Sequence, residues 1–225
     1  MADEQALEDV FGGPEGLLTA DLSGRVIAET STVMPDFIRT LARRVADQGG
    51  MLVDAPILGT VGPAREGKIT VVAGGPDAAV ERVKPVFGHL SNAFFPMGAS
   101  GNGATMKLVV IMHLCTYWQS LAEALKMGRC NGLSDITMLE VLLDSPVATS
   151  ALKVKMPLIR GETSEVGYDI GGVCDVLRRA LELADLQRVA APASQNAMKS
   201  FADIRDSGRQ RRDVIQLVLD AIGRG

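Results

Sequence analysis

The alternation of apolar and polar positions predicts strands and helices in turn over the first hundred residues. Apolar runs of strand length end in polar or glycine-rich segments at residues 26–28, 51–56 and 68–75. Apolar residues recur at helical spacing at 4–11, 37–45 and 76–87, between or beside these runs. Strands that alternate with helices predict a parallel sheet with helices on its faces, and ligands of such sheets gather at the carboxyl ends of the strands.

The pattern changes near Met97, and every later segment has helical spacing. A long helix is expected within residues 98–130, because no Gly or Pro interrupts the chain between Gly103 and Gly128. Further helices are expected at 134–143, 168–186, 192–206 and 209–222. We therefore predict two domains, an α/β domain at residues 1–97 and an all-α domain at residues 98–225.

Lys107 is the unusual residue of the predicted long helix. It follows glycines 98, 101 and 103 and shares a helical face with Val110 and Ile111, so its amine is set among aliphatic side chains. The polar residues of the helix recur on another side, at His113, Thr116, Ser120 and Glu123. Either the Lys107 amine extends to solvent or it takes part in chemistry.

Composition and charge narrow the function classes. With 47% hydrophobic and 22% charged residues the chain has the composition of a soluble globular protein, and a net charge of −4 provides no basic surface for nucleic acid. The longest apolar run, 108–112, is much shorter than the roughly 20 residues that span a bilayer. Three separated cysteines fit a reducing cytoplasm, and two histidines offer little for a metal site. We expect a cytoplasmic protein with no metal, membrane or nucleic-acid partner.

Three separated motifs carry a resemblance to a known family. They are Thr-Ser-Thr-Val-Met-Pro at 30–35, Asp-Ala-Pro-Ile-Leu-Gly-Thr-Val-Gly-Pro-Ala-Arg-Glu-Gly at 54–67, and Gly-Asn-Gly-Ala-Thr-Met-Lys at 101–107. In order and spacing they resemble the β-hydroxyacid dehydrogenase family, which includes 3-hydroxyisobutyrate dehydrogenase and tartronate semialdehyde reductase. The resemblance extends from about residue 6 to 223. It implies a Rossmann-like domain for NAD or NADP, a long interdomain helix, and a helical dimerisation domain like that of 6-phosphogluconate dehydrogenase.

The resemblance also implies roles for single residues. Lys107 matches the catalytic lysine, which passes a proton to or from the substrate oxygen while hydride moves to or from the nicotinamide. Ser31 and Thr32 match the segment that contacts the cofactor. Gly59 and Thr60 match the loop that lines the pocket of a small-molecule substrate.

Several positions differ from the family pattern. Val110 and Ile111 stand where the family has paired asparagines beside the substrate, and Leu58 replaces a serine of the substrate loop. Asp175 stands where the family has a lysine that faces the cofactor. No Gly-x-Gly-x-x-Gly precedes the first predicted strand, so we expect that the N-terminal half of the Rossmann domain is missing.

Two interpretations follow and stay open at this point. The chain is an NAD(P)-dependent oxidoreductase of the 3-hydroxyisobutyrate dehydrogenase type, acting on a small hydroxy acid, a semialdehyde or a related, less polar substrate. Alternatively, it is a non-catalytic dimeric paralogue that serves as a binding or interaction protein. In both cases we expect a homodimer or higher homo-oligomer, because half of a parallel sheet exposes a strand edge.

Overall fold

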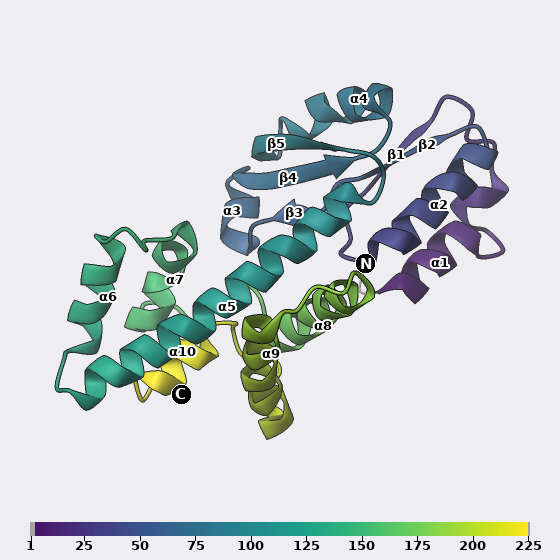
Figure 1. Cartoon of the computed structure of the whole chain (residues 1–225). Helices are drawn as coiled ribbons and strands as arrows, with labels where there is room; N and C mark the ends of the chain where they lie inside the picture. Colours follow the sequence, from purple (N-terminus) through teal and green to yellow (C-terminus); the bar gives the residue numbers. More distant parts are fainter. Residues whose placement is uncertain (1–2, 225) are drawn as a thin grey trace. The chain divides into compact units, whose positions relative to one another are not determined.

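The structure is a computed structural model that describes residues 3–224. Its internal contacts divide the chain into two compact units, one up to Ile111 and the other from Met112 onward (Figure 1). This division lies inside the long helix α5 (Asn102–Cys130). The domain boundary predicted from composition, at residue 97, lies instead near the end of the last strand, β5 (Ser91–Gly98). The two units are described separately below.

The first unit alternates strands and helices as the sequence predicts. Its elements before β5 are α1 (Glu4–Gly12), η1 (Leu17–Thr19), β1 (Val26–Glu29), α2 (Pro35–Asp47), β2 (Met51–Asp54), β3 (Ile57–Leu58), α3 (Val61–Arg65), β4 (Ile69–Gly74) and α4 (Asp77–Phe87). The strand β3 and the helix α3 lie in a segment that the sequence predicts as loop. With two and five residues, both elements are too short to show a hydrophobic period in the sequence. The strand β3 forms because Ile57 and Leu58 pair with Val71 and Thr70 of β4.

The sheet is mixed, so the prediction of a parallel sheet is wrong for part of it. β1 pairs with β2 in parallel and β4 pairs with β5 in parallel, but β4 runs antiparallel to β2 and to β3. The cause lies in the connection between β2 and β4, which contains only β3 and the five-residue helix α3. A parallel partner is usually reached through a crossover that contains a full α-helix, and this connection has none; instead its strand β3 folds back against β4 as an antiparallel neighbour.

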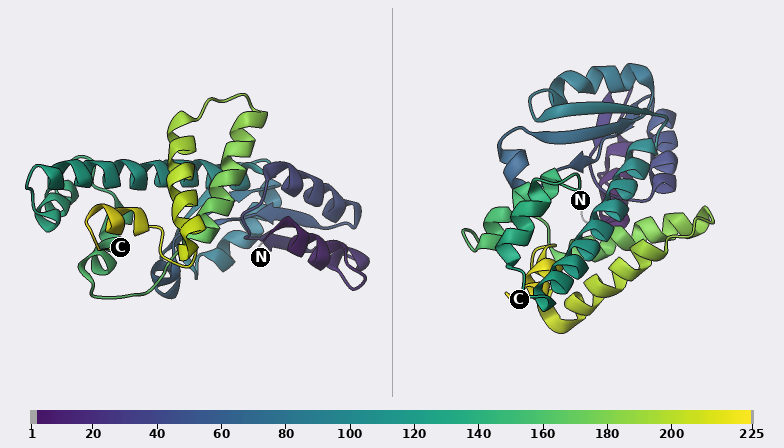
Figure 2. Two further views of the ribbon diagram at one scale, coloured as in Figure 1. Left: turned by 90° about the horizontal axis from the view of Figure 1, so that it is seen from below. Right: turned by 60° about the vertical axis from the view of Figure 1, so that its left-hand side comes forward.

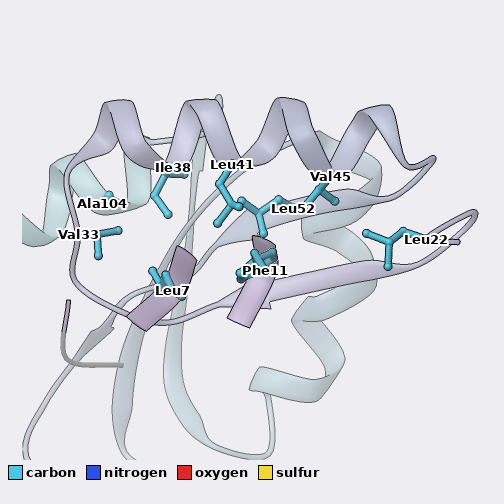
Figure 3. Packing of buried hydrophobic residues seen from close by; sticks show 9 residues of the cluster. All are labelled: Leu7, Phe11, Leu22, Val33, Ile38, Leu41, Val45, Leu52 and Ala104. Carbon is cyan, nitrogen blue, oxygen red and sulfur yellow. The ribbon is translucent and has the colours of Figure 1, made fainter. Parts of the chain in front are cut away.

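Two separate cores cover the two faces of this sheet. Leu52 and Val53 are neighbours on β2 and point to opposite faces, as alternation along a strand requires. Leu52 packs with α1 and α2, and Val53 packs with α4. The core on the Leu52 side consists of Leu7, Phe11, Leu22, Val33, Ile38, Leu41, Val45, Leu52 and Ala104 (Figure 3). Because Ala104 belongs to α5, the first turn of α5 is packed into the first unit.

The second unit is helical throughout the part that the structure describes, which confirms the predicted all-α class. After α5 it contains α6 (Asp135–Leu143), α7 (Ser150–Arg160), α8 (Ile170–Leu186), α9 (Pro192–Ile204), the π-helical turn η2 (Arg205–Arg209) and α10 (Gln216–Ala221). Helices α8 and α9 lie side by side in both views of Figure 2. Helix α7 was not predicted, since Pro157 interrupts its pattern, yet the Thr149 hydroxyl caps it by accepting from the Leu152 amide.

The helix predicted at 209–222 forms only over its last third, as α10. Gly208 has a φ of +83°, a left-handed conformation that ends the preceding helix. Asp213, inside the predicted helix, is instead buried and holds an extended bridge to Asp169. Its carboxylate pairs with the Lys155 ammonium at 2.5 Å and accepts from the Gly167 amide at 2.9 Å. The buried ion pair therefore ties α7 to the loop before α10.

Helix α5 has the amphipathic character that its sequence predicts. His113, Ser120 and Glu123 of the polar stripe are exposed, whereas Trp118 is only 1% exposed. The Trp118 ring contacts Tyr117 at 5.0 Å, and within the described residues its indole N–H has no hydrogen-bond partner. By length and composition alone α5 is one helix that could cross a membrane, a test that the core helix of a soluble protein also passes.

Candidate active site

The carboxyl ends of β1 and β2 lie at the same edge of the sheet, as expected from their parallel pairing. Glu29 and Asp54, the last residues of the two strands, are register partners. In the segment after β1 the Ser31 amide donates to both carboxylate oxygens of Glu29, at 2.8 and 2.9 Å. Ser31 is buried and Thr32 is half-buried, so the residues predicted to contact the cofactor lie at this edge.

Lys107 lies in the second turn of α5 and turns toward the protein interior. Its ammonium donates to the Ile57 carbonyl at 2.7 Å, at the first residue of β3. Burial lowers the pKa of this amine from 10.5 to about 8, because the charged form is poorly solvated. The hydrogen bond to Ile57 holds this amine against β3, and a role of Lys107 in chemistry stays a prediction.

This hydrogen bond brings Lys107 beside the loop that the sequence predicts as a substrate site. Gly59 and Thr60 directly follow β3; Gly59 is exposed, and Thr60 is half-buried at the start of α3. Val110 and Ile111 lie about one turn after Lys107 on α5, where Val110 is half-buried and Ile111 is buried. The first unit thus contains the half-buried amine of Lys107 and two aliphatic side chains on α5, beside a glycine-containing loop that follows β3.

Asp175, the last predicted site residue, belongs to the second unit. It lies on the exposed side of α8, where its carboxylate forms a 3.6 Å ion pair with Arg178. Its predicted contact with the cofactor stays a prediction.

Asp54 is a residue whose role the sequence did not reveal. Its side chain is buried, at 1% exposure, and its two carboxylate oxygens accept from the Gly101 amide at 2.9 Å and the Ala104 amide at 2.8 Å. Burial raises the pKa of this carboxyl from 3.8 to about 6, although hydrogen bonds from these amides and that of Gly103 act in the opposite direction. The aspartate was expected at the ligand edge, and it is used there to hold the start of α5.

The glycines before Lys107 are explained by close packing. Gly101 has a φ of +87°, and a Cβ at this position would lie 2.9 Å from the Pro35 carbonyl oxygen. A Cβ at Gly103 would lie 2.5 Å from the Asp54 carbonyl oxygen and 2.7 Å from that of Val72. The motif Gly-x-Gly at 101–103 therefore lets α5 begin directly against β2 and β4.

One hollow of the first unit lies apart from Lys107. It encloses about 340 Å³ and is lined by Arg39, Ala42, Arg43, Ala46, Gly50, Met51, Leu52, Pro76 and Ser100. Among the described residues no group of three or more His, Cys, Asp or Glu side chains is arranged to hold a metal ion.

A nucleotide-binding type of sheet, a long connecting helix and a helical second part define the class of two-domain NAD(P)-dependent oxidoreductases. Residues 1–98 match the family model described as the NAD binding domain of 6-phosphogluconate dehydrogenase. Residues 101–219 match the model described as the NAD-binding domain of NADP-dependent 3-hydroxyisobutyrate dehydrogenase. The chain belongs to this 3-hydroxyisobutyrate dehydrogenase-like family of β-hydroxyacid dehydrogenases.

Individual relatives agree with this assignment. The chain is 30% identical to 2-(hydroxymethyl)glutarate dehydrogenase of Eubacterium barkeri over 94% of its own length and 71% of the relative. Its fold matches 3-hydroxyisobutyrate dehydrogenase of Mycobacterium tuberculosis, solved with L-serine, with a TM-score of 0.87 and 18% identity over 98% of this chain and 77% of that one. It also matches Psf3 in complex with NADP+ and 2-OPP, with a TM-score of 0.84 and 20% identity over 95% and 75% of the two chains.

These findings settle part of what the sequence predicts about the nucleotide domain. The NAD-binding match extends over residues 1–98, and it does not support the prediction that half of the domain is missing. The hydroxyls and main chain around Ser31 and Thr32 fit a contact with one part of a dinucleotide, at the usual edge of the sheet. A glycine-rich turn for the pyrophosphate, of the form Gly-x-Gly-x-x-Gly after a strand, does not occur within residues 3–224.

Proposed function

We propose that this protein is an NAD(P)-dependent dehydrogenase or reductase for a small hydroxy acid, a semialdehyde or a related substrate, with Lys107 as its proton donor and acceptor. The observation that carries the proposal is the half-buried Lys107 amine, which donates to the Ile57 carbonyl and has a pKa lowered to about 8. An acid–base group works best when its pKa is close to the operating pH. An exposed structural lysine would not need such an environment.

The bound nicotinamide would supply or accept the hydride. In the reducing direction the Lys107 ammonium donates a proton to the carbonyl oxygen of the substrate as negative charge develops on it. In the oxidising direction the neutral amine takes the proton of the substrate hydroxyl. Because its pKa lies near 8, both protonation states are populated at mildly alkaline pH, and one side chain serves both directions.

The surroundings of Lys107 favour a substrate with an apolar body. Leu58, Val110 and Ile111 offer aliphatic surface where the family pattern has polar side chains, and Ile111 is buried at 3% exposure. We propose that polar groups of the substrate bind to main-chain amides around Gly59 and Thr60, since a loop with glycine admits a carboxylate close to the backbone. This combination fits a semialdehyde or a branched hydroxy acid, or a less polar substrate such as an imine.

The cofactor, the assembly and the location are parts of the same proposal. The NADP+ in the Psf3 complex supports NADP as one candidate cofactor, with NAD as the other. We propose a homodimer, which is supported by apolar side chains that the second unit exposes, among them Met127 at 68% and Val141 at 62%. The proposed location is the cytoplasm, on the basis of the three separated cysteines alone. A monomeric mass in light scattering would contradict the dimer.

A competing candidate is a non-catalytic dimeric paralogue that acts as a binding or interaction protein. It is favoured by Val110 and Ile111, which provide no hydrogen bond to a substrate or to Lys107. The two candidates differ in what Lys107 does, because a paralogue without redox activity has no use for a proton donor.

The experiment measures NADH and NADPH oxidation with a panel of small semialdehydes, keto acids and cyclic imines, on the wild type and two variants. The variant Lys107→Ala removes the proposed donor, and Lys126→Ala removes an exposed lysine of the same helix as a control. We expect turnover that falls about 100-fold or more in Lys107→Ala and is unchanged in Lys126→Ala. Stabilisation by either nucleotide in thermal denaturation tests binding separately. Turnover that survives in Lys107→Ala, or no nucleotide binding at millimolar concentration, would overturn the proposal.

A further inference from the structure

We propose that Asp54 is a positioning residue for Lys107: its carboxylate fixes the first turn of α5 against the end of β2, so that the Lys107 amine reaches the Ile57 carbonyl. The inference depends on the proposed function only for its effect on turnover, because the placement of the amine is a property of the fold.

Two sets of hydrogen bonds join the segment at residues 54–57 to the start of α5, one at the first turn of the helix and one about a turn later. Asp54 accepts from the Gly101 and Ala104 amides at 2.9 and 2.8 Å, and Lys107 donates to the Ile57 carbonyl at 2.7 Å. Asp54 and Ile57 are three residues apart on one segment, and Ala104 and Lys107 are three residues apart, about one helical turn, on the other. The carboxylate therefore fixes the helix at its start, and the amine reaches the neighbouring segment one turn later.

A carboxylate is the group suited to this position. The first N–H groups of a helix lack partners within the helix and carry partial positive charge, so an anion stabilises them. The Gly101 amide donates to one carboxylate oxygen and the Ala104 amide to the other, and asparagine would replace one of these acceptors with an NH2 group, which only donates. The carboxylate also fits tightly, because a Cβ at Gly74 would lie 2.7 Å from Asp54 Oδ1 and one at Gly103 would lie 2.8 Å from Oδ2.

The charged groups of the neighbouring segments have partners of their own. The Glu29 carboxylate, from the register partner of Asp54 on β1, accepts from the Ser31 amide. The Arg39 guanidinium of α2, which approaches Gly101, pairs with Asp36 at 2.5 Å. Lys107 donates to Ile57. The Asp54 pKa is set by burial and by main-chain hydrogen bonds from the start of α5, so its titration reports on the helix start.

The experiment follows the pKa of Lys107 itself by NMR of protein labelled with 13C at the lysine ε carbons. The Lys107 signal is assigned by its loss in Lys107→Arg. In the wild type we expect its main titration at about 8 and a smaller change near 6, where Asp54 takes up a proton and its hydrogen bonds to the α5 amides change. In Asp54→Asn we expect the small change to disappear and the Lys107 pKa to move toward its ordinary value of 10.5.

The matched control is Asp169→Asn, which removes a carboxylate that caps a different helix, α8, by accepting from the Gly172 amide at 2.8 Å. This variant lowers stability but leaves the Lys107 titration unchanged. A wild-type titration without a step near 6 overturns the proposal even if Asp54→Asn does not fold. An Asp54→Asn variant whose Lys107 titrates as in the wild type also overturns it.

Turnover provides the second readout where the protein is active. Asp54→Asn should lower kcat by about 10- to 100-fold with a smaller change in KM, because the donor is displaced while the substrate loop remains. The titration does not require turnover, so failure of the proposed function and failure of the positioning role are distinguishable.

Discussion

Each unit of this protein shields a lysine and an aspartate from solvent, but the two units satisfy these charges in different ways. Lys155 and Asp213 of the second unit are both buried, whereas in the first unit Asp54 is buried and Lys107 is half-buried. In the second unit Lys155 and Asp213 pair with each other at 2.5 Å, with side-chain exposures of 9% and 3%. In the first unit the lysine and the aspartate are served separately by main-chain groups: Asp54 by amides of α5, and Lys107 by the Ile57 carbonyl. The same residue types therefore form an ion pair in one unit, and in the other unit two charges that are hydrogen-bonded to the main chain but not paired with an opposite charge.

The difference separates a structural use of charge from a chemical one. An ion pair that is closed on itself has no net charge to offer a ligand and resists the loss of either partner. Lys107 donates to a neutral carbonyl, so no opposite charge offsets the desolvation of its ammonium. Desolvation lowers its pKa to about 8, which makes its proton transferable near neutral pH. The contrast fits a structural role for Lys155 and the proposed acid–base role for Lys107.

The largest effect is expected from breaking the closed pair. Lys155→Met leaves the buried Asp213 carboxylate without its cation, and we expect a loss of about 3–5 kcal/mol in the free energy of unfolding. Lys153→Met, at an exposed position of the same helix, is the control and should change little. Urea denaturation measures both. A loss below about 1 kcal/mol in Lys155→Met would remove the structural half of the comparison.

The pH dependence of stability tests the buried Asp54 carboxylate, which is hydrogen-bonded to amides but has no cation beside it. Its pKa is about 6 in the folded state and 3.8 in the unfolded chain, so between these values the folded state binds the extra proton. The stabilising contribution is complete below about pH 4 and is lost as pH rises through 6, by up to about 3 kcal/mol. The difference in unfolding free energy between wild type and Asp54→Asn, measured from pH 3.5 to 7.5, should show this slope. A flat difference curve contradicts it.

The close approach of α5 to Asp54 predicts the next effect. Gly103→Ala would place a methyl group 2.5 Å from the Asp54 carbonyl oxygen, and we expect a loss of about 1–3 kcal/mol. Gly62→Ala is the matched control, because a Cβ at this helical glycine meets no atom within 4 Å. Its stability should be unchanged or slightly higher. Equal thermal denaturation of the two variants would show that contact with Asp54 is not what requires the glycine.

The smallest change is expected in the opposite direction. Lys107→Met removes the desolvated ammonium but leaves the Ile57 carbonyl unpaired, and we expect a net gain of about 1–2 kcal/mol in stability at pH 7. Since the folded pKa of about 8 lies below 10.5, the unfolded chain alone binds this proton between those values, and wild-type stability rises with pH there. The gain should shrink by pH 10.5. A Lys107→Met variant that is less stable than the wild type at pH 7 would show that Lys107, like Lys155, stabilises the fold.

Much of the fold could be predicted because its signals are local. The strand and helix alternation before residue 97 and most of the helices after it appear as hydrophobic periods. Of the polar stripe predicted for α5, His113, Ser120 and Glu123 are exposed, whereas Thr116 is half-buried. The direction of β4 could not be predicted, since it depends on pairing with β2 and β3 rather than on its own pattern. Helix α10 was predicted too long because the periodicity does not show the burial of Asp213 against Lys155.

The site was predictable where a motif names a residue and its location. The motif at 101–107 singled out Lys107, and its placement beside residues 57–60 agrees with the order of the motifs. The role of Asp54 could not be predicted, because its partners lie 47 and 50 residues away in sequence. The cofactor contact of Asp175 stays a prediction, because its side chain is exposed on α8 and its ion-pair partner there is Arg178 of the same helix.

Trp118 makes the two units unequal in optical experiments. It is the single tryptophan of the chain, it belongs to the unit after Ile111, and it is buried without a hydrogen-bond partner for its indole within the described residues. Intrinsic tryptophan fluorescence therefore reports the unfolding of the helical unit and is nearly blind to the unit that contains Asp54 and Lys107. Emission that changes at one denaturant concentration while circular dichroism changes at another would show directly that the units melt independently.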